Sequence, residues 1–302
     1  MNNQKVDIVY SWSGIPDKNT RRSDSPQRYR YNNELKYSIR SLFKYAQWIN
    51  HIYILINPTT TPPYWLKDDK KITIINRCKL FDNKHNCPTY NSMAVHAICH
   101  KIEGLAEHFI IFDDDIFLKN NVDISYFFNQ SGLPIVRQPY KKTRIALELW
   151  EKAFFSSGLK NNIKKFPEYK FASHSHRPKP MSIGLIDMFN KEYPGVSELI
   201  QSHVHRTYGL EFMTDMIYYE FLYNLGLIDY RQNDKTFVQF GVSENFNEIS
   251  FRNHSRLINQ PNIKCFNIND NWSLDSATYS RQMDNLSNFF EETFPEKPDC
   301  EI

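Results

Sequence analysis

The sequence lacks any long hydrophobic run. No apolar stretch in its 302 residues approaches the roughly 20 residues that a membrane-spanning helix needs. The polar start, Met1 to Gln4, also lacks the charged and then apolar layout of a secretion signal. Internal repeats and low-complexity tracts are missing too. We therefore expect a cytoplasmic protein with no transmembrane segment, long enough to bury a sizeable core.

The sequence also has no excess of one charge. Lysine and arginine together number 37, and aspartate and glutamate together number 34, which leaves a formal net charge of +3. Neither sign dominates enough to produce a large uniform field. The composition therefore excludes a disordered acidic tail and a strongly basic nucleic-acid binder. We expect no nucleic-acid partner, and any ligand must be recognised at a local site.

Cysteines are few and do not show a metal-binding spacing. The sequence contains five of them, and no two form a CxxC pair: Cys78, Cys87, Cys99, Cys265 and Cys300. An odd number fits a reducing compartment better than a disulfide framework. The sequence therefore predicts five free thiols.

Short apolar runs alternate with a helical pattern in the first quarter of the chain. Three runs, at residues 6–12, 51–56 and 72–75, are typical of β-strands. Between the first two, apolar residues recur at helical spacing from Leu35 to Ala46, and Asn32 or Asn33 is placed to cap that helix. A strand, a helix and a strand in this order indicate a parallel α/β sheet.

Further elements are expected along the rest of the chain. Residues 109–112 form a fully apolar run, as in a buried parallel strand. Pro178 and Pro180 are expected to open a helix that ends at Asn190. The other expected elements are helices at 92–100, 212–225 and 276–294 and a strand at 236–240, while 141–170 carries no sharp signal and is expected to be helical and surface-facing.

Three consecutive aspartates, Asp113, Asp114 and Asp115, directly follow the apolar run at 109–112. They should therefore lie at the carboxyl edge of a parallel sheet, where open α/β folds bind ligands. Mg²⁺ or Mn²⁺ takes one or two carboxylates together with phosphate oxygens of a substrate. An isolated triplet would equally well form a solvated turn or a helix cap.

Asp7 lies in the first expected strand, where a carboxylate is costly unless it is paired or coordinates a cation. It is a candidate second acidic group of the same cleft. The alternative is a structural role, in which Asp7 caps a loop or pairs with an arginine.

Basic residues gather in two loops of the second half. The segment from His174 to Met181 contains two histidines, Arg177 and Lys179 between prolines, so it could present a base and phosphate-binding donors together. Arg206 follows two further histidines and could bind a phosphate through two hydrogen bonds of its guanidinium. The alternatives are a zinc-like histidine pair, a solvated basic loop and a surface arginine.

Taken together, these motifs resemble the four conserved regions of the Stealth phosphotransferases, in order and over nearly the whole chain. That family includes bacterial capsule polymerases and the lysosomal-enzyme N-acetylglucosamine-1-phosphotransferase. The residues that carry the resemblance are Asp7–Trp12 with Asp17; Arg28–Ser41, Trp48, Ile52–Ile54, Pro63, Trp65, Pro88–Ser92, His100–Leu105 and Asp113–Asp115; His176–Pro178 with Arg206; and Asn269–Asp270 with Phe294–Pro295. Two departures stand out: Asp113 replaces the usual asparagine, and Asn267 replaces a usual cysteine.

The resemblance implies a fold and a reaction. The fold is α/β and Rossmann-like: a nucleotide-sugar transferase (GT-A-like) core with a mostly parallel sheet and a helical insertion. We expect one catalytic domain over 1–302, with a nucleotide-sugar half to about residue 135, a helical middle segment at about 141–230 and a C-terminal part that completes the site. The reaction transfers a sugar-1-phosphate from a nucleotide-diphosphate sugar, expected to be a UDP-linked hexosamine or hexose, to an acceptor hydroxyl. It forms a phosphodiester and releases the nucleoside monophosphate, in the synthesis of capsule or surface polysaccharide.

The resemblance also implies roles for single residues, all expected to converge on one cleft. Mg²⁺ or Mn²⁺ would be held by Asp114, Asp115 and Asp270. His176 or Asp7 would take the hydroxyl proton, and Arg206 would neutralise the transferred phosphate. The expected substrate-binding residues are Arg28, Asn32, Arg40, Asn91 and Asn269.

The implied partners are a nucleotide-sugar donor and an oligosaccharide or lipid-linked polysaccharide acceptor, and the protein could bind peripherally at the inner face of the cell membrane. Two other functions remain open. A metal-dependent glycosyltransferase of the same fold would release a nucleoside diphosphate, and a non-catalytic saccharide-binding module would release no nucleotide.

Overall fold

The computed structural model describes residues 4–14, 31–137, 176–205, 213–232, 234–241, 248–269 and 275–302. The expected helix at 141–170 lies outside these residues. Among the helices that are described, none combines the length and the hydrophobicity that crossing a membrane requires.

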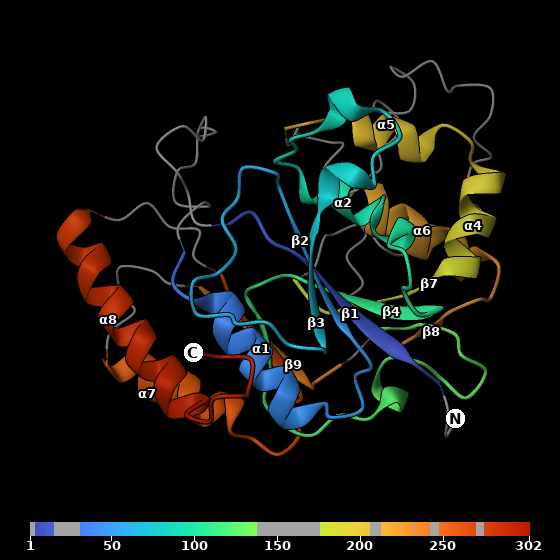
Figure 1. Ribbon diagram of the computed structural model, residues 1–302. Coiled ribbons are helices and arrows are strands. Elements are labelled where there is room, and N and C mark those ends of the chain that lie inside the picture. The colour runs from blue at the N-terminus through green and yellow to red at the C-terminus, as the bar shows by residue number, and fades with distance from the viewer. Residues whose placement is uncertain are drawn as a thin grey trace.

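The centre of the molecule is a five-stranded sheet of order β3-β2-β1-β4-β7 (Figure 1). Its strands are β1 (Val6–Ser11), β2 (Ile52–Ile56), β3 (Ile72–Asn76), β4 (His108–Phe112) and β7 (Lys179–Ser182). The first four are parallel to one another, and β7 pairs antiparallel with β4 at the edge. The predicted α/β fold with a mostly parallel sheet is therefore confirmed.

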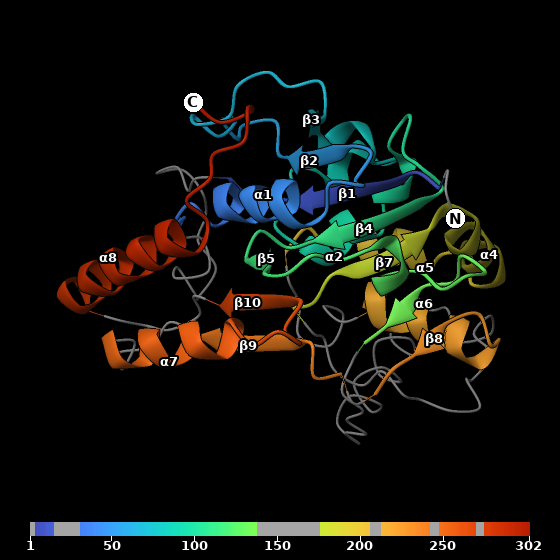
Figure 2. The same ribbon diagram turned by 90° about the horizontal axis from the view of Figure 1, so that it is seen from below.

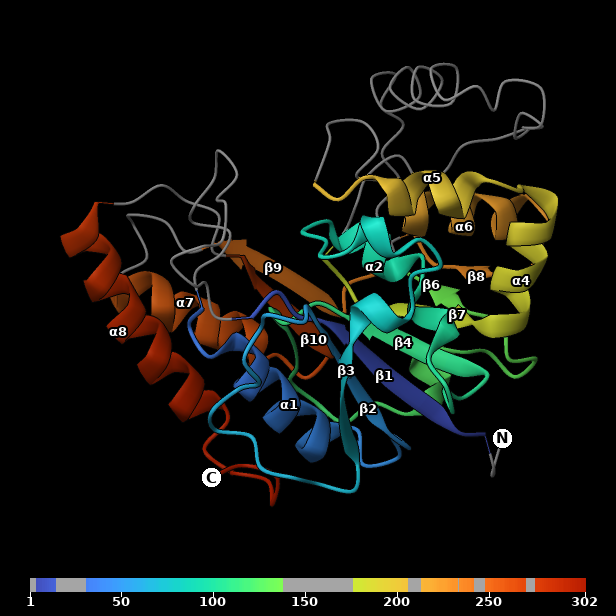
Figure 3. The same cartoon turned by 45° about the horizontal axis from the view of Figure 1, so that its top comes forward.

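Neighbouring side chains along each strand pack on opposite faces of this sheet, as the pleat requires. Val9 and Ile111 contribute to one core with four helices, whereas Ile8 and Ile110 contribute to the core beneath α1. The helices of the first face lie together in Figures 1 and 3, away from α1. They are α2 (Ser92–His96), α4 (Ile183–Glu192), α5 (Val196–Ser202) and α6 (Met213–Asn224), and α1 spans Glu34–Tyr45.

A second, smaller sheet lies below the first and is covered by two helices (Figure 2). Its strands are β5 (Ile116–Leu118), β10 (Cys265–Asn269) and β9 (Phe237–Gly241), with β10 in the middle, and the helices are α7 (Glu248–Ile258) and α8 (Ser276–Thr293). Stacked phenylalanines such as Phe117 and Phe266, with ring centroids 5.1 Å apart, fill the space between sheet and helices. A two-stranded parallel pair, β6 (Ile135–Val136) and β8 (Asp229–Tyr230), completes the strands of the described chain.

Several expected elements differ in detail. Pro178 and Pro180 do not open a helix: Lys179–Ser182 forms β7, and α4 begins only after Ser182, whose hydroxyl caps it. A proline is tolerated in β7 because that strand is at the sheet edge. Asn33 occupies the N-cap position of α1, but its side chain makes no capping bond. The expected helix at 92–100 is split into α2 and a 3₁₀ turn, Cys99–Lys101.

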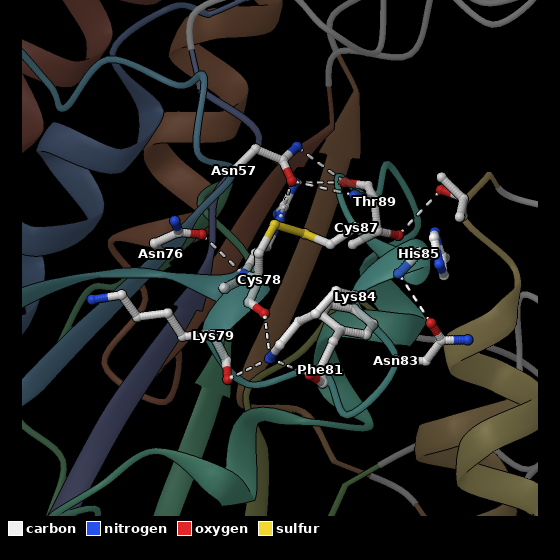
Figure 4. Close-up of a disulfide and its surroundings, with 12 residues drawn as sticks. Asn57, Asn76, Cys78, Lys79, Phe81, Asn83, Lys84, His85, Cys87 and Thr89 are labelled. Carbon is white, nitrogen blue, oxygen red and sulfur yellow. Dashed lines mark hydrogen bonds between the residues drawn. A yellow bond between two sulfur atoms is a disulfide. The ribbon is translucent and has the colours of Figure 1, made fainter.

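The prediction of five free thiols is wrong, because a disulfide joins Cys78 and Cys87 (Figure 4). Cys78 follows β3, and Cys87 ends the short loop behind it. Lys84 folds that loop back, since its ammonium donates to the carbonyl oxygens of Phe81 at 2.5 Å and Cys78 at 3.2 Å. The other three cysteines are buried and free. Disulfides are rare in reducing compartments, so the cysteines no longer support such a location.

Candidate functional site

Acidic and basic side chains from three distant parts of the chain meet at the carboxyl end of β4. Asp113 and Asp115 lie in the turn between β4 and β5. His176 lies just before β7, and Asn269 ends β10. Strands β2 and β3 were added on one side of β1, and β4 lies on its other side. The strand order therefore reverses between β1 and β4, and open α/β sheets bind ligands at the carboxyl end of such a reversal.

Two carboxylates and one imidazole form a compact group there. His176 Nδ1 is 3.5 Å from Asp115 Oδ2 and 3.9 Å from Asp113 Oδ2. One ligand atom from each of the three residues lies within 4.8 Å of the others. Oxygen and nitrogen atoms so close together can converge on a single divalent cation.

The charge distribution of this group also fits a cation. Burial by itself lowers the pKa of His176, but the carboxylates of Asp115 and Asp113 outweigh this and raise it. Asp115 Oδ1 is buried and has no hydrogen-bond partner within the described part of the chain. A buried carboxylate oxygen without a donor is costly, so a bound cation would satisfy it. Asp113, Asp115 and His176 therefore could hold a metal ion.

Lys179 and His96 complete the surroundings of Asp113. The buried ammonium of Lys179 lies 2.8 Å from Asp113 Oδ2, and the buried His96 Nε2 lies 3.7 Å from Asp113 Oδ1. The sequence marks Lys179 as a possible phosphate-binding donor of a basic loop, whereas the structure pairs it with Asp113; the sequence gives no signal for His96. These contacts fix the orientation of the Asp113 carboxylate.

The candidate metal-binding group differs from the expected one. The structure brings Asp113 rather than Asp114 into the group with Asp115. Burial raises the pKa of Asp114 well above its usual range, and the carboxylates of Asp115 and Glu34 add to the effect. The charge of Asp114 also raises the pKa of the buried Tyr10 beneath α1. Glu34 begins α1 and Tyr10 packs beneath it, so Asp114 lies on the α1 side of the turn.

Asn269 is the expected substrate-binding residue that does reach this group. Its Nδ2 lies 3.5 Å from His176 Nε2. Two positions earlier on β10, Asn267 donates from Nδ2 to the backbone oxygen of Asp115 at 3.0 Å. The end of β10 therefore holds both Asp115 and His176 in place.

Asp7 lies at the other end of the sheet. It pairs in register with Phe109 near the start of β4, and its carboxylate accepts hydrogen bonds from Asn50 Nδ2 and from the backbone N–H of Ala106, both at 2.7 Å. Asn50 precedes β2 and Ala106 precedes β4, so Asp7 ties the amino ends of three strands together. The hypothesis that Asp7 shares the cleft as a base is wrong.

Arg40 is a structural residue. Its buried guanidinium donates to both carboxylate oxygens of Glu301, at 2.7 and 2.6 Å, to Glu291 at 2.9 Å and to the Phe294 carbonyl at 2.6 Å. These partners all belong to the last twelve residues. Arg40 therefore clamps the C-terminal segment to α1 and is not available to a substrate.

Asn91 and Asn32 are also used by the fold. Asn91 Oδ1 accepts from the Met93 N–H and so caps α2, while its Nδ2 donates to the His203 carbonyl at 3.0 Å. Asn32 Nδ2 donates to Glu34, and its Oδ1 accepts from the Tyr279 hydroxyl at 2.8 Å. Both side chains are thus engaged in contacts that hold the fold together. Three further expected site residues lie outside the described residues: Arg28, Arg206 and Asp270.

Comparison with known proteins identifies part of the chain directly. The fold and the group at β4 define an α/β protein with a candidate metal site at its sheet edge. Residues 28–136 match the family model described as Stealth protein CR2, conserved region 2. The chain thus carries conserved region 2 of the Stealth proteins, and the resemblance seen in the sequence is confirmed for this region.

Curated relatives match parts of the chain. An exopolysaccharide phosphotransferase CpsY of Mycobacterium leprae is 30% identical over 222 residues, covering 67% of this chain and 40% of that protein. CpsY of Mycobacterium tuberculosis is 37% identical over 156 residues, or 47% and 29% of the two chains. The capsular polysaccharide phosphotransferase LcbA of Neisseria meningitidis is 32% identical over 146 residues, or 43% and 39%. The matches thus span well under half the length of these relatives.

Among solved structures, mouse xyloside xylosyltransferase 1 in its apo form aligns with 91% of this chain and 99% of its own, with a TM-score of 0.44 and 8% identity. A likeness at this level carries no functional conclusion.

Proposed function

We propose that this protein is a metal-dependent sugar-1-phosphate transferase. The observation that carries the proposal is the group formed by Asp113, Asp115 and His176 at the sheet edge, two of whose members lie inside the matched Stealth region. The names of the relatives, exopolysaccharide and capsular polysaccharide phosphotransferases, point to the same reaction class. In the proposed reaction an acceptor hydroxyl attacks the sugar-bearing phosphorus of a nucleotide-diphosphate sugar. The bond from the acceptor oxygen to this phosphorus forms as the bridging P–O bond of the diphosphate breaks, so that a phosphodiester results, a nucleoside monophosphate leaves and the hydroxyl proton is released to solvent.

Phosphoryl transfer depends on positioning and on the stabilisation of charge more than on covalent chemistry. A divalent cation, Mg²⁺ or Mn²⁺, bound by the two aspartates and His176 would neutralise the donor diphosphate and the leaving phosphate. The chain itself supplies the orientation. Lys179 holds the Asp113 carboxylate, and β10 holds Asp115 and His176 through Asn267 and Asn269.

His176 changes role in this proposal. We had expected it to act as the general base, but its Nδ1 lies between two carboxylates. We propose that Nδ1 ligates the cation that these carboxylates would hold, because a neutral imidazole nitrogen is a common metal ligand. Arg206 remains our proposed partner of the transferred phosphate, because a guanidinium can bind a phosphate through two hydrogen bonds.

The donor is proposed to be a UDP-linked hexosamine or hexose, and the acceptor an oligosaccharide or lipid-linked polysaccharide of the capsule or cell surface. We further propose that the protein works in the cytoplasm, at the inner face of the cell membrane. The names of the relatives support a saccharide acceptor.

The nucleotide that is released tests the proposal. The purified chain is incubated with a panel of nucleotide sugars, a capsular oligosaccharide and Mg²⁺ or Mn²⁺, and the products are separated by chromatography. A nucleoside monophosphate that forms only with metal and acceptor supports sugar-1-phosphate transfer. A nucleoside diphosphate would instead show attack at the anomeric carbon, as in a glycosyltransferase. Saccharide binding without release of either nucleotide would indicate a binding module.

A further inference from the structure

A small pocket with two arginines lies beside the segment that carries His176. Arg177 follows His176 directly, and Arg137 follows β6. The pocket is also lined by Tyr126, Phe127, Phe237 and Cys265. It is far smaller than the sites that enclose a whole small molecule. The pocket therefore has no room for a complete nucleotide sugar and could take only a single small group.

The charges in this pocket do not balance. Asp234 is the carboxylate that faces both arginines: its Oδ2 is 2.8 Å from Arg177 Nη1, and its Oδ1 is 4.0 Å from Arg137 Nε. That Oδ1 already accepts from the backbone N–H of Thr236 at 3.1 Å and from its hydroxyl at 2.6 Å. Arg137 is thus left without a hydrogen-bonded carboxylate in the described chain. Arg137 Nη1 instead donates to the Tyr126 carbonyl oxygen, so that, among the described residues, two cations and one anion leave one positive charge.

Both guanidinium groups are largely removed from water and held in place by aromatic rings. The side chains of Arg137 and Arg177 are 11% and 15% exposed. Arg137 stacks on Tyr126 with 3.9 Å to the ring centroid, and Arg177 stacks on Phe237 with 4.2 Å. Arg177 Nε is buried and has no hydrogen-bond partner among the described residues. A desolvated cation with unused donors is costly unless an anion binds there.

We infer that this pocket is a binding subsite for one phosphate group. Two guanidinium groups offer paired N–H donors that match the oxygens of a phosphate. Arg177 and Cys265 place the pocket near the start of β10, whereas Asn269 and His176 lie at its end. Four residues of extended strand separate the two positions by about 13 Å. The two phosphates of a nucleotide diphosphate are directly bonded, so a group in this pocket is not the one bound at the metal.

The source of the phosphate rests on the proposed function: it is a phosphodiester of the acceptor chain, one or more sugars away from the attacking hydroxyl. Binding of phosphate itself does not depend on that function. The inference can therefore be tested in two separate steps.

The first step measures binding of inorganic phosphate to the whole chain by calorimetry, in the presence of EDTA so that no metal contributes. Arg137→Gln and Arg177→Gln should each weaken phosphate binding by about tenfold or more, since each removes charged hydrogen bonds. The matched control is Arg231→Gln, because Arg231 is half exposed and pairs with Asp229 on the surface nearby. This control should leave the affinity unchanged.

A variant that binds phosphate more tightly serves as a second control, because a misfolded protein would lose binding and not gain it. Asp234→Asn keeps the shape of the side chain but removes the competing negative charge, so phosphate should bind about threefold more tightly or better. Circular dichroism confirms the fold of each variant. No phosphate binding to the wild type, or equal binding in the wild type and both arginine variants, would overturn the inference. Unchanged or weaker binding in a folded Asp234→Asn protein would also contradict it.

The second step identifies the source in the transferase assay. Arg137→Gln should raise KM for an acceptor that carries a phosphodiester and leave KM unchanged for the donor and for a phosphate-free acceptor. A raised donor KM would show that the pocket binds the donor and would refute the acceptor assignment. If no nucleotide is released at all, the proposed function fails, while the calorimetry still decides whether the pocket binds phosphate.

Discussion

Loss of the Arg40 guanidinium should destabilise the fold without altering the proposed metal site. The guanidinium is buried, with 1% of its side chain exposed, and donates to Glu301, Glu291 and the Phe294 carbonyl. In Arg40→Met the Glu301 carboxylate, 3% exposed, would remain buried without its partner. Breaking one side of a buried ion pair typically costs about 3–5 kcal/mol. That is a large share of the roughly 5–15 kcal/mol by which a domain is stable.

The assay is urea unfolding followed by circular dichroism at pH 7. Lys44→Met is the matched control, because Lys44 on the same helix also pairs with a glutamate of the C-terminal segment, Glu296, at 2.6 Å. The Lys44 and Glu296 side chains are 31% and 71% exposed, and such surface pairs contribute only about 0–1 kcal/mol. Arg40→Met should therefore lower the free energy of unfolding by several kcal/mol more than Lys44→Met does.

Two results would refute this reasoning. The first is a cost for Arg40→Met no larger than that of the control. The second is an Arg40→Met protein of normal stability that no longer binds the nucleotide-sugar donor, which would restore the substrate-binding role predicted from the sequence. A double variant, Arg40→Met with Glu301→Met, should recover part of the loss, because it no longer leaves a buried charge unpaired.

Two further predictions concern cysteines and acid stability. Thiol titration of protein unfolded without reductant should find three reactive cysteines per chain, and five would show that Cys78 and Cys87 are unpaired. Burial lowers the pKa of His100, and the neighbouring Lys101 adds to this. His100 in the unfolded chain therefore binds a proton more tightly than His100 in the folded protein. The free energy of unfolding should fall as the pH drops below about 6.5, the usual histidine pKa, toward the lower pKa of the folded protein. His100→Gln should reduce that acid-induced loss in urea unfolding between pH 7 and 5, and an unchanged pH profile would contradict it.

The sequence was a good guide to the four parallel strands of the central sheet but found only β9 of the second sheet, close to the expected strand at 236–240. Apolar runs such as 109–112 are typical of buried strands, and β1 to β4 lie where they were expected. By contrast, β5 has only three residues, and β10 reads as a mixed polar segment. These strands form because Phe117 and Phe266 stack beneath α8, a contact between residues far apart in the sequence.

The site was partly predictable for a similar reason. Asp115, His176 and Asn269 meet as expected, since strand ends and loops of a parallel sheet gather at one edge. Which of Asp113 and Asp114 joins them depends on the path of the turn, and that path is set by β5 and β10. Asp7 resembled a site residue because it is charged and lies in an apolar strand. Its hydrogen-bond donors are the Asn50 side chain and the Ala106 backbone N–H, which are far away in the sequence, so the local sequence pattern does not predict them.

The most direct test of the account is a titration of the metal-free protein with Mn²⁺. The electron paramagnetic resonance signal of the free ion measures how much Mn²⁺ remains unbound. Asp115→Asn, Asp113→Asn and His176→Gln should each weaken Mn²⁺ binding by at least about tenfold, since each removes a proposed ligand. Asp114→Asn, on the α1 side of the turn, should change the affinity much less. The account is contradicted if Asp114→Asn abolishes binding while Asp113→Asn and His176→Gln bind Mn²⁺ as tightly as the wild type.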